Sequence, residues 1–206
     1  MRRRPRLYVF VRAPALGAVK RRLAAGVGAV EALRFYRAAT ESLLRRVGRD
    51  PRWDTVLAVT PDTAAHGVSP WPAGFARVGQ GGGDLGARMG RILARDPAVP
   101  VAIAGSDIPE LGARHVESAF AALRNADLVF GPAADGGYWL IGRRPGAATR
   151  GLFDGVRWSS PHALADTRAN VPPGRRVALL ETLEDVDDAE AYARWRVRRN
   201  ARRGAR

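Results

Sequence analysis

The residue whose type and position most clearly suggest chemistry is Asp107. It lies in the segment GSDIP (residues 105–109), directly after an apolar run typical of a buried strand. A carboxylate at the carboxyl end of a strand, followed by a proline that fixes the turn, is well placed to hold a hard divalent cation. The alternative is that Asp107 only caps a turn or the helix expected from Gly112.

A second acidic group, EDVDD (residues 184–188), follows the last expected strand. If that strand ends near the centre of the sheet, Asp187 or Asp185 meets Asp107 across one metal ion. Magnesium takes one or two protein carboxylates and completes its octahedron with water and phosphate oxygens. Capping of the C-terminal helix by Asp187 or Asp188 is the alternative, and the two roles are compatible.

The composition suggests one side chain that could contact a phosphate group. Among 34 lysine and arginine residues, Lys20 is the single lysine. Lysine acts on phosphate as a compact point charge, whereas arginine acts as a planar fork, so a lone lysine after the first strand is a candidate phosphate contact. Chance is the competing explanation.

The glycine-rich segment GQGGGDLG (residues 79–86) lies between an expected strand and an expected helix, where backbone amides can approach a ligand closely. Its Gly81, Gly83 and Gly86 also satisfy the G-x-G-x-x-G spacing of dinucleotide sites. That signature belongs after the first strand of a β-α-β unit, whereas this segment follows a short third strand. The NAD interpretation is therefore disfavoured.

A second glycine-rich segment, GPAADGGY (residues 131–138), is bounded closely by two expected strands. It is interpreted as a substrate-facing loop with Asp135 at its tip, or alternatively as a hairpin-like turn built on Asp-Gly. The three histidines stand in unrelated places, without G-x-S-x-G or H-E-x-x-H, so a serine hydrolase or a zinc enzyme is disfavoured.

The elements that must position these residues alternate in type along the chain. Strands are expected at 6–12, 53–60, 75–79, 99–105, 127–131, 138–142 and 176–180, and helices from about 20 and at 30–47, 84–94, 112–123, 161–169 and 189–199. This alternation predicts a mainly parallel sheet covered by helices on both faces. Ligands of such sheets lie beyond the carboxyl ends of the strands, which here are followed by segments 12–22, 79–89, 105–109 and 131–138.

Length and composition bound the remaining possibilities. A chain of 206 residues with 46% hydrophobic content suits one domain, and without cysteine any metal must sit on oxygen or imidazole. The absence of a long apolar run or signal segment predicts a cytoplasmic protein without a membrane span. Most of the net charge of +14 comes from residues 1–6 and 193–206. These ends are expected to be solvated, partly frayed tails, and a nucleic-acid-binding module is the alternative that salt-dependent binding would reveal.

Several motifs, in this order, resemble the rSAM/selenodomain-associated transferase family of the GT-A, nucleotide-diphospho-sugar transferase superfamily. They are AP with Gly17 (13–17), KRRL (20–23), GDLG with RM (83–89), GSDIP (105–109), GPAADGGY with LIG (131–142), LF (152–153), WS (158–159) and DVD (185–187). The resemblance runs from Tyr8 to Tyr192. A fainter resemblance extends to the guanylyltransferases of cofactor F420 and molybdenum-cofactor synthesis.

The family resemblance implies a Rossmann-like three-layer fold and a glycosyltransferase that uses Mg²⁺ or Mn²⁺, a nucleotide-sugar donor and a small acceptor. By position it implies catalytic roles for Lys20, Asp107 and Asp135, a metal held by Asp107 and Asp187, donor contacts from Arg12, Lys20, Arg22, Gly81, Gly82, Gly83, Asp84 and Leu85, and acceptor contacts from Asp135, Gly136, Gly137 and Tyr138. Arg21 departs from the family, which more often has a small hydroxyl residue there. Nucleotidyl transfer from an NTP to a phosphorylated or carboxylate acceptor is the alternative. The oligomeric state is open, a homodimer included.

Overall fold

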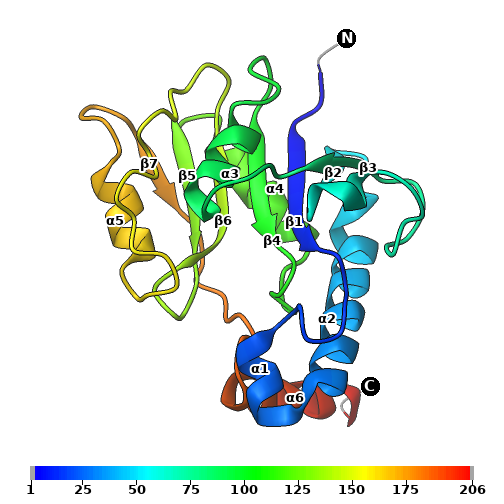
Figure 1. Cartoon of the computed structure of the whole chain (residues 1–206). Coiled ribbons are helices and arrows are strands. Elements are labelled where there is room, and N and C mark those ends of the chain that lie inside the picture. Colours follow the sequence, from blue (N-terminus) through cyan, green and yellow to red (C-terminus); the bar gives the residue numbers. More distant parts are fainter. Residues whose placement is uncertain (1–2, 205–206) are drawn as a thin grey trace.

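The protein is an α/β sandwich built on one twisted sheet (Figure 1). The structure, a computed structural model, describes residues 3–204. Its sheet has seven strands in the order β3-β2-β1-β4-β6-β5-β7. The strands are β1 (Arg6–Arg12), β2 (Asp54–Thr60), β3 (Ala76–Gly79), β4 (Val101–Gly105), β5 (Leu128–Pro132), β6 (Tyr138–Arg143) and β7 (Val177–Leu179). The predicted mainly parallel sheet is confirmed.

One strand runs against the others. β6 pairs antiparallel with both β4 and β5, while the remaining neighbouring strands pair in parallel. Only residues 133–137 connect β5 to β6, and a parallel crossover needs about a dozen residues or more. The two strands therefore form a hairpin, whose turn reaches the same edge as the carboxyl ends of β1 and β4.

Helices cover both faces of the sheet, as the alternating pattern predicts. They are α1 (Arg21–Val27), α2 (Ala29–Leu43), α3 (Leu85–Leu93), α4 (Ala113–Ala122), α5 (Ala163–Ala169) and α6 (Ala189–Gly204), with a π-helical turn at Leu44–Gly48 after α2 and a 3-10 turn at Asp62–Ala65. None of the helices in the described chain is both long enough and apolar enough to span a membrane.

Two apolar layers form because the central strands are buried on both faces. Leu7 and Val9 of β1 point to the layer that contains the end of α2 and the apolar side of α4. Tyr8, between them, points to the opposite layer, where Ile92 and Leu93 of α3 pack. This strict alternation is what a fully covered strand requires, and it fixes β1 in the middle of the sheet.

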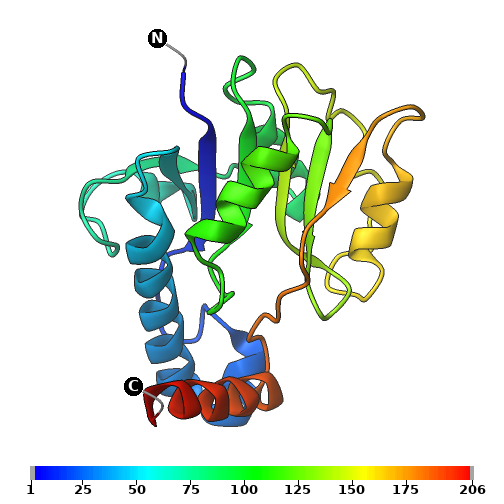
Figure 2. The same cartoon turned by 180° about the vertical axis from the view of Figure 1, so that it is seen from behind.

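A third apolar cluster joins the two ends of the chain. Leu23 of α1, Phe35 of α2 and Tyr192 of α6 pack together, and the Phe35 ring lies 5.3 Å from the Tyr192 ring, centre to centre. Figures 1 and 2 show α1 and α6 side by side next to the first turns of α2, beyond the carboxyl ends of the strands. The segments that flank these helices therefore face the edge where a ligand is expected.

The basic C-terminal segment corrects the prediction of a frayed tail. The helix expected to end at Arg199 continues to Gly204. Two of its arginines, Arg194 and Arg198, pair with Glu184, and the guanidinium of Arg199 lies 5.2 Å from the centre of the Trp195 ring. These contacts hold part of the basic charge against the protein. The N-terminal Arg4 and Arg6 similarly face Asp54.

Candidate active site

A cleft of about 690 Å³ opens at the carboxyl ends of the strands. All four predicted strand-end segments contribute to its wall, together with residues 158–160 and the acidic segment before α6. Of the residues predicted to act in the site, those lining the cleft are Arg12, Lys20, Arg22, Leu85, Asp107, Asp135, Gly137, Tyr138 and Asp187. The topology thus brings distant parts of the chain to one place, as expected for this sheet class.

Lys20 is the centre of the charged part of the cleft. Its Nζ lies 2.7 Å from Oδ2 of Asp107 and 3.4 Å from Oδ1 of Asp187, and its side chain is only 5% exposed. Burial alone lowers the pKa of Lys20, but the two carboxylates outweigh burial and leave the pKa raised. The ammonium is therefore charged at neutral pH and offsets one of the two negative charges that face it.

The backbone at Lys20 is strained. Its φ of 49° and ψ of 50° lie in the left-handed region, at the position that caps the start of α1. For a residue with a side chain such a conformation costs on the order of 1 kcal/mol, and it is found mostly at turns and functional sites. The conformation turns the chain sharply from the β1 loop into α1.

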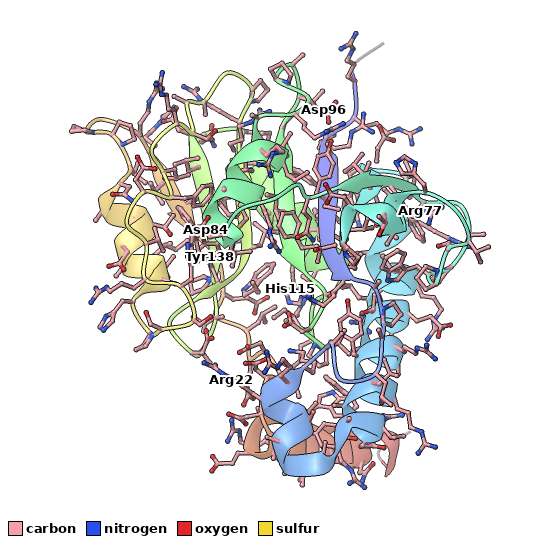
Figure 3. All side chains as sticks on the ribbon, viewed as in Figure 1. Arg22, Arg77, Asp84, Asp96, His115 and Tyr138 are labelled. Carbon is pink, nitrogen blue, oxygen red and sulfur yellow. The ribbon has the colours of Figure 1, made fainter. Side chains whose placement is uncertain are left out.

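Arg22 lies two residues further along the chain, in the first turn of α1, and contributes a second cation. Its Nη1 is 3.3 Å from Oδ2 of Asp187, and the side chain is 65% exposed. Figure 3 shows Arg22 at the end of α1 that faces the sheet. In contrast to the enclosed ammonium of Lys20, this guanidinium is open to solvent and to any ligand in the cleft.

The carboxylate of Asp107 faces Lys20 and does not cap α4. Gly112 occupies the N-cap position of that helix, so the alternative in which Asp107 caps the helix is wrong. Burial raises the pKa of Asp107, but the adjacent ammonium outweighs it and the pKa is lowered. The backbone oxygen of Asp107 also accepts a hydrogen bond from the Val186 N–H at 3.3 Å, which ties the acidic segment to the end of β4.

The acidic segment divides its tasks between neighbouring residues. Asp188 caps α6, since its Oδ1 accepts a hydrogen bond from the Ala191 N–H at 2.8 Å, while Asp187 faces the two cations. Burial, followed by the negative charges of Asp135 and Asp107, raises the pKa of Asp185 to about 6. This part of the cleft therefore holds more negative charge than Lys20 compensates.

The first glycine-rich loop is held by charged side chains. Gly81 and Gly83 have φ values of 81° and 93°, which favour glycine. Arg88 donates to the Gly83 carbonyl at 2.9 Å, and the Gly81 N–H donates to Asp62 at 3.0 Å. Asp84 caps α3 through the Ala87 N–H at 2.8 Å, which confirms the predicted cap.

The position of this loop relative to the cleft differs from the expected donor site. Gln80 and Leu85 line the cleft, whereas Gly81, Gly82, Gly83 and Asp84 between them do not. Donor contacts by those four residues stay a prediction. The loop also follows β3, which is an edge strand, and this agrees with the rejection of a dinucleotide fingerprint.

The second glycine-rich loop is both a hairpin turn and a wall of the cleft. The Asp135 side chain folds back onto the loop, where its Oδ1 accepts a hydrogen bond from the Gly137 N–H at 2.8 Å. Gly136 has a φ of 86°, and a Cβ there would lie 2.3 Å from the carbonyl oxygen of Pro161. Gly136 itself does not line the cleft, whereas Asp135, Gly137 and Tyr138 do. The hairpin interpretation is therefore confirmed, while the interpretation as a substrate-facing loop stays a prediction for a segment that lines the cleft.

Several cleft residues were not assigned a role from the sequence. Tyr36 of α2 fixes the end of β1, because its hydroxyl accepts the Arg12 N–H at 2.7 Å and donates to the Arg12 carbonyl at 2.9 Å. Trp158 lines the cleft with a buried Nε1 that has no hydrogen-bond partner, and Ser159 beside it has a φ of 57°. The paired Trp-Ser was visible as a motif, but nothing local indicated that its loop returns to the site.

A metal ion bound in this cleft would be held by carboxylate oxygens. Within residues 3–204, no group of three or more Asp, Glu or His side chains is arranged to hold one ion. The cleft instead offers Asp107 and Asp187 as a pair with the ammonium of Lys20 between them. Two carboxylates match the usual protein share of a magnesium site, in which water and phosphate oxygens complete the shell.

Solved structures of the same fold were found. A protein from Desulfovibrio desulfuricans G20, provisionally assigned as a nucleotide-diphospho-sugar transferase, is 30% identical over 91% of this chain and 84% of that one, with a TM-score of 0.78. The 4-diphosphocytidyl-2C-methyl-D-erythritol synthase of Anaerococcus prevotii DSM 20548 is 11% identical, covers 93% of this chain and 95% of that one, and has a TM-score of 0.54.

A third structure, Rv0371c from Mycobacterium tuberculosis H37Rv in complex with manganese, is 16% identical, with a TM-score of 0.50 over 93% of this chain and 97% of that one. The two more distant similarities concern the fold alone. A comparison with curated proteins gives no match.

The fold and the cleft define a transferase with the nucleotide-diphospho-sugar transferase architecture, which confirms the expected fold class. The chain belongs to the family described as uncharacterized protein conserved in bacteria (DUF2064), whose model matches residues 43–160. The matched segment contains Asp107 and Asp135, while Lys20 and Asp187 lie outside it on either side.

Proposed function

We propose that the chain transfers a sugar from a nucleotide-diphospho-sugar donor to a small acceptor, in a reaction that requires Mg²⁺ or Mn²⁺. The observation that carries this proposal is the convergence of Lys20, Asp107 and Asp187 at the carboxyl ends of the strands. Cations and carboxylates side by side are what a metal-bound pyrophosphate requires. The 30% identical Desulfovibrio protein, assigned to the same class, supports the choice of donor.

In this proposal the donor pyrophosphate lies against Lys20 and Arg22, and Arg12 extends the same positive wall. Arg22 is exposed and free to form a bidentate contact, because its link to Asp187 is a single 3.3 Å approach. The nucleoside would lie toward Leu85 and the loop Gly81–Asp84. A nucleoside in the cleft could contact the backbone of that loop only by extending beyond Gln80 or Leu85, the two neighbouring residues that line the cleft.

The metal would be held by Asp107 and Asp187. Burial, and after it the nearby carboxylates of Asp135 and Asp107, raises the pKa of Asp185 to about 6, and a cation at this place would offset that repulsion between carboxylates. When bound, the metal would neutralise charge on the departing diphosphate. Lys20 and Arg22 add to this stabilisation from fixed positions, so that little reorganisation is needed as charge develops.

The acceptor side of the proposal rests on Asp135. One of its oxygens accepts the Gly137 N–H, which orients the carboxylate and leaves the second oxygen for a proton. In glycosyl transfer this oxygen would take the proton of the acceptor hydroxyl as the acceptor oxygen bonds to the anomeric carbon. The bond from that carbon to the diphosphate breaks, and a nucleoside diphosphate leaves. Gly136, Gly137 and Tyr138 would complete the acceptor contacts.

Nucleotidyl transfer is the second candidate, because the same cations and carboxylates suit a nucleoside triphosphate. An acceptor phosphate or carboxylate would attack the α-phosphorus, pyrophosphate would leave, and no base would be required. The low exposure of Lys20 favours neither reaction. The fold of the Anaerococcus enzyme shows that this architecture also occurs in proteins named for diphosphocytidyl chemistry.

The released product separates the two reactions. We would incubate the protein with Mg²⁺, a panel of nucleotide sugars and triphosphates, and candidate acceptors, and identify products by phosphorus NMR and chromatography. A nucleoside diphosphate released only with acceptor supports glycosyl transfer. Pyrophosphate as the product would replace it with nucleotidyl transfer.

The remaining expectations belong to the same proposal. Residues 1–206 would form one transferase domain, act in the cytoplasm, and be related to the selenodomain-associated transferases by the motifs they share. Binding of nucleic acid through the basic ends is the alternative role. Removal of residues 1–6 and 193–206 tests it only in part, because α6 packs on α1 and α2, so substitution of the exposed arginines is the better test.

A further inference from the structure

The ammonium of Lys20 lies against both carboxylates that are proposed as metal ligands. It lies 2.7 Å from Asp107 and 3.4 Å from Asp187, and it is the least exposed of the three side chains. Asp107 and Asp187 are 36% and 39% exposed, so both can be reached from the cleft. In this ion-paired state the protein's own cation thus lies next to both carboxylates, although their side chains stay accessible from the cleft.

We propose that Lys20 is a resident cation that excludes the metal until phosphate draws its ammonium away, so that metal and nucleotide bind in a coupled manner. This inference rests on the proposed function, since it assumes the metal pair Asp107 and Asp187. Without phosphate, an incoming dication meets a monocation already held between its ligands. With phosphate present, the ammonium has a new anionic partner, and the two carboxylates become available.

The local structure suits this exchange. The Lys20 ammonium is carried by a flexible four-carbon stem, and lysine contacts phosphate as a point charge that needs no fixed orientation. The backbone of Lys20 is held by the start of α1, where the Ala24 N–H donates to the Lys20 carbonyl at 2.8 Å. The side chain can thus change partners while the backbone and the two aspartates stay in place.

Arg22 provides an internal contrast. It also touches Asp187, at 3.3 Å, but it is 65% exposed and forms neither a hydrogen bond nor an ion pair with Asp107. An exposed guanidinium is screened by solvent and salt, so its effect on an incoming cation is small. Coupling should therefore depend on Lys20 and hardly on Arg22.

The size of the effect follows from Coulomb's law. Repulsion between a dication and an ammonium roughly 4 Å apart corresponds, even at the dielectric constant of water, to about a thirtyfold loss of metal affinity. Salt screens part of it. By reciprocity, whatever factor nucleotide phosphate adds to the affinity for metal, the metal adds to the affinity for that phosphate.

The test measures Mn²⁺ binding to the full chain by the electron paramagnetic resonance signal of the free ion, without nucleotide. Lys20→Met keeps the buried apolar stem and removes the charge, and it should bind Mn²⁺ about tenfold more tightly than the wild type. The matched control Arg22→Met should change the affinity by less than about threefold. Adding Asp107→Asn to Lys20→Met should abolish the gain, which locates the ion. Lys20→Gln serves if the methionine variant does not fold.

A second measurement uses pyrophosphate, the group shared by every candidate donor. In the wild type, Mn²⁺ and pyrophosphate together should raise the melting temperature by more than the sum of their separate effects. In Lys20→Met, Mn²⁺ alone should raise it and the synergy should vanish. If wild type and Lys20→Met bind Mn²⁺ equally well at Asp107, the inference is overturned and the proposed function stands. If neither responds to Mn²⁺, even with pyrophosphate, both are overturned.

Discussion

Gly136 allows a sharp prediction about the loop that carries Asp135. Its φ is 86°, and an added Cβ would lie 2.3 Å from the Pro161 carbonyl oxygen and 2.6 Å from the Pro161 Cα. Both atoms belong to the backbone, so no side-chain rotation can relieve the contact. The Gly136 carbonyl also accepts the Leu164 N–H at 3.0 Å, which holds the loop and the start of α5 together.

Gly136→Ala should therefore destabilise the protein by two separable effects. The left-handed backbone alone costs on the order of 1 kcal/mol for a residue with a Cβ. Forcing the two backbone segments apart adds about 1–3 kcal/mol, the usual penalty for overpacking. Gly146→Ala is the matched control, because its φ is 71° and nothing lies within 4 Å of its Cβ.

The free energy of unfolding in urea, measured for both variants at pH 7, separates the two effects. The control should lose about 1 kcal/mol, and Gly136→Ala about 2–4 kcal/mol. Equal losses would refute the backbone contact. A Gly136→Ala protein that is stable and fully active would also show that the loop carrying Asp135 does not need its present position.

Four further outcomes are expected. Asp107→Asn should abolish metal-dependent nucleotide binding in calorimetry while the melting temperature without ligand changes by only a few degrees, and loss of folding would contradict it. Lys20→Ala should weaken nucleotide binding at saturating Mg²⁺ by about 1.5–3 kcal/mol, the scale of a charge-assisted hydrogen bond. Asp135→Asn should lower glycosyl turnover by about 10²–10⁴-fold with donor affinity unchanged. Asp127→Asn should reduce the loss of folding stability that the wild type shows as the pH is lowered. The Arg176 N–H and neighbouring arginines lower the pKa of Asp127 from its ordinary 3.8. The ionised side chain therefore stabilises the fold above pH 3.8, and this stabilisation is lost as the pH falls below 3.8.

Local chemistry and the order of the elements predicted much of the fold and the edge of the sheet at which the cleft lies. Asp84 caps α3 as expected, because a cap is decided by residues three positions apart. Because β1 and β4 are neighbours, with Phe10 opposite Gly105, the topology brings the segments that follow these two strands to one edge of the sheet. The direct pairing of Lys20 with Asp107 was not predicted.

Long-range geometry accounts for what the sequence did not reveal. An apolar run indicates burial but not direction, so the antiparallel β6 could be inferred only from the short connection after β5. Trp158 reaches the cleft because Gly86 of α3 leaves space for it: a Cβ at Gly86 would lie 2.9 Å from the Trp158 ring. Such complementarity between separate segments has no local signature. The same holds for α6, whose arginines find acidic and aromatic partners only in the folded protein.

The third apolar cluster has a consequence for synthesis of the protein. Lys20 and Asp187 are separated by 167 positions in the chain, and Gly26 of α1 packs so closely on α6 that a Cβ there would lie 2.5 Å from the Ala189 Cβ. On a ribosome that adds roughly 5–20 residues each second, the first helix therefore waits about ten seconds or more for the segment that covers it. Until then Leu23 and Phe35 lack part of their apolar cover, and the ammonium of Lys20 lacks one of its two carboxylates. A nascent chain can assemble most of the sheet, but its charged centre is completed only after the segment that carries Asp187 has been synthesised.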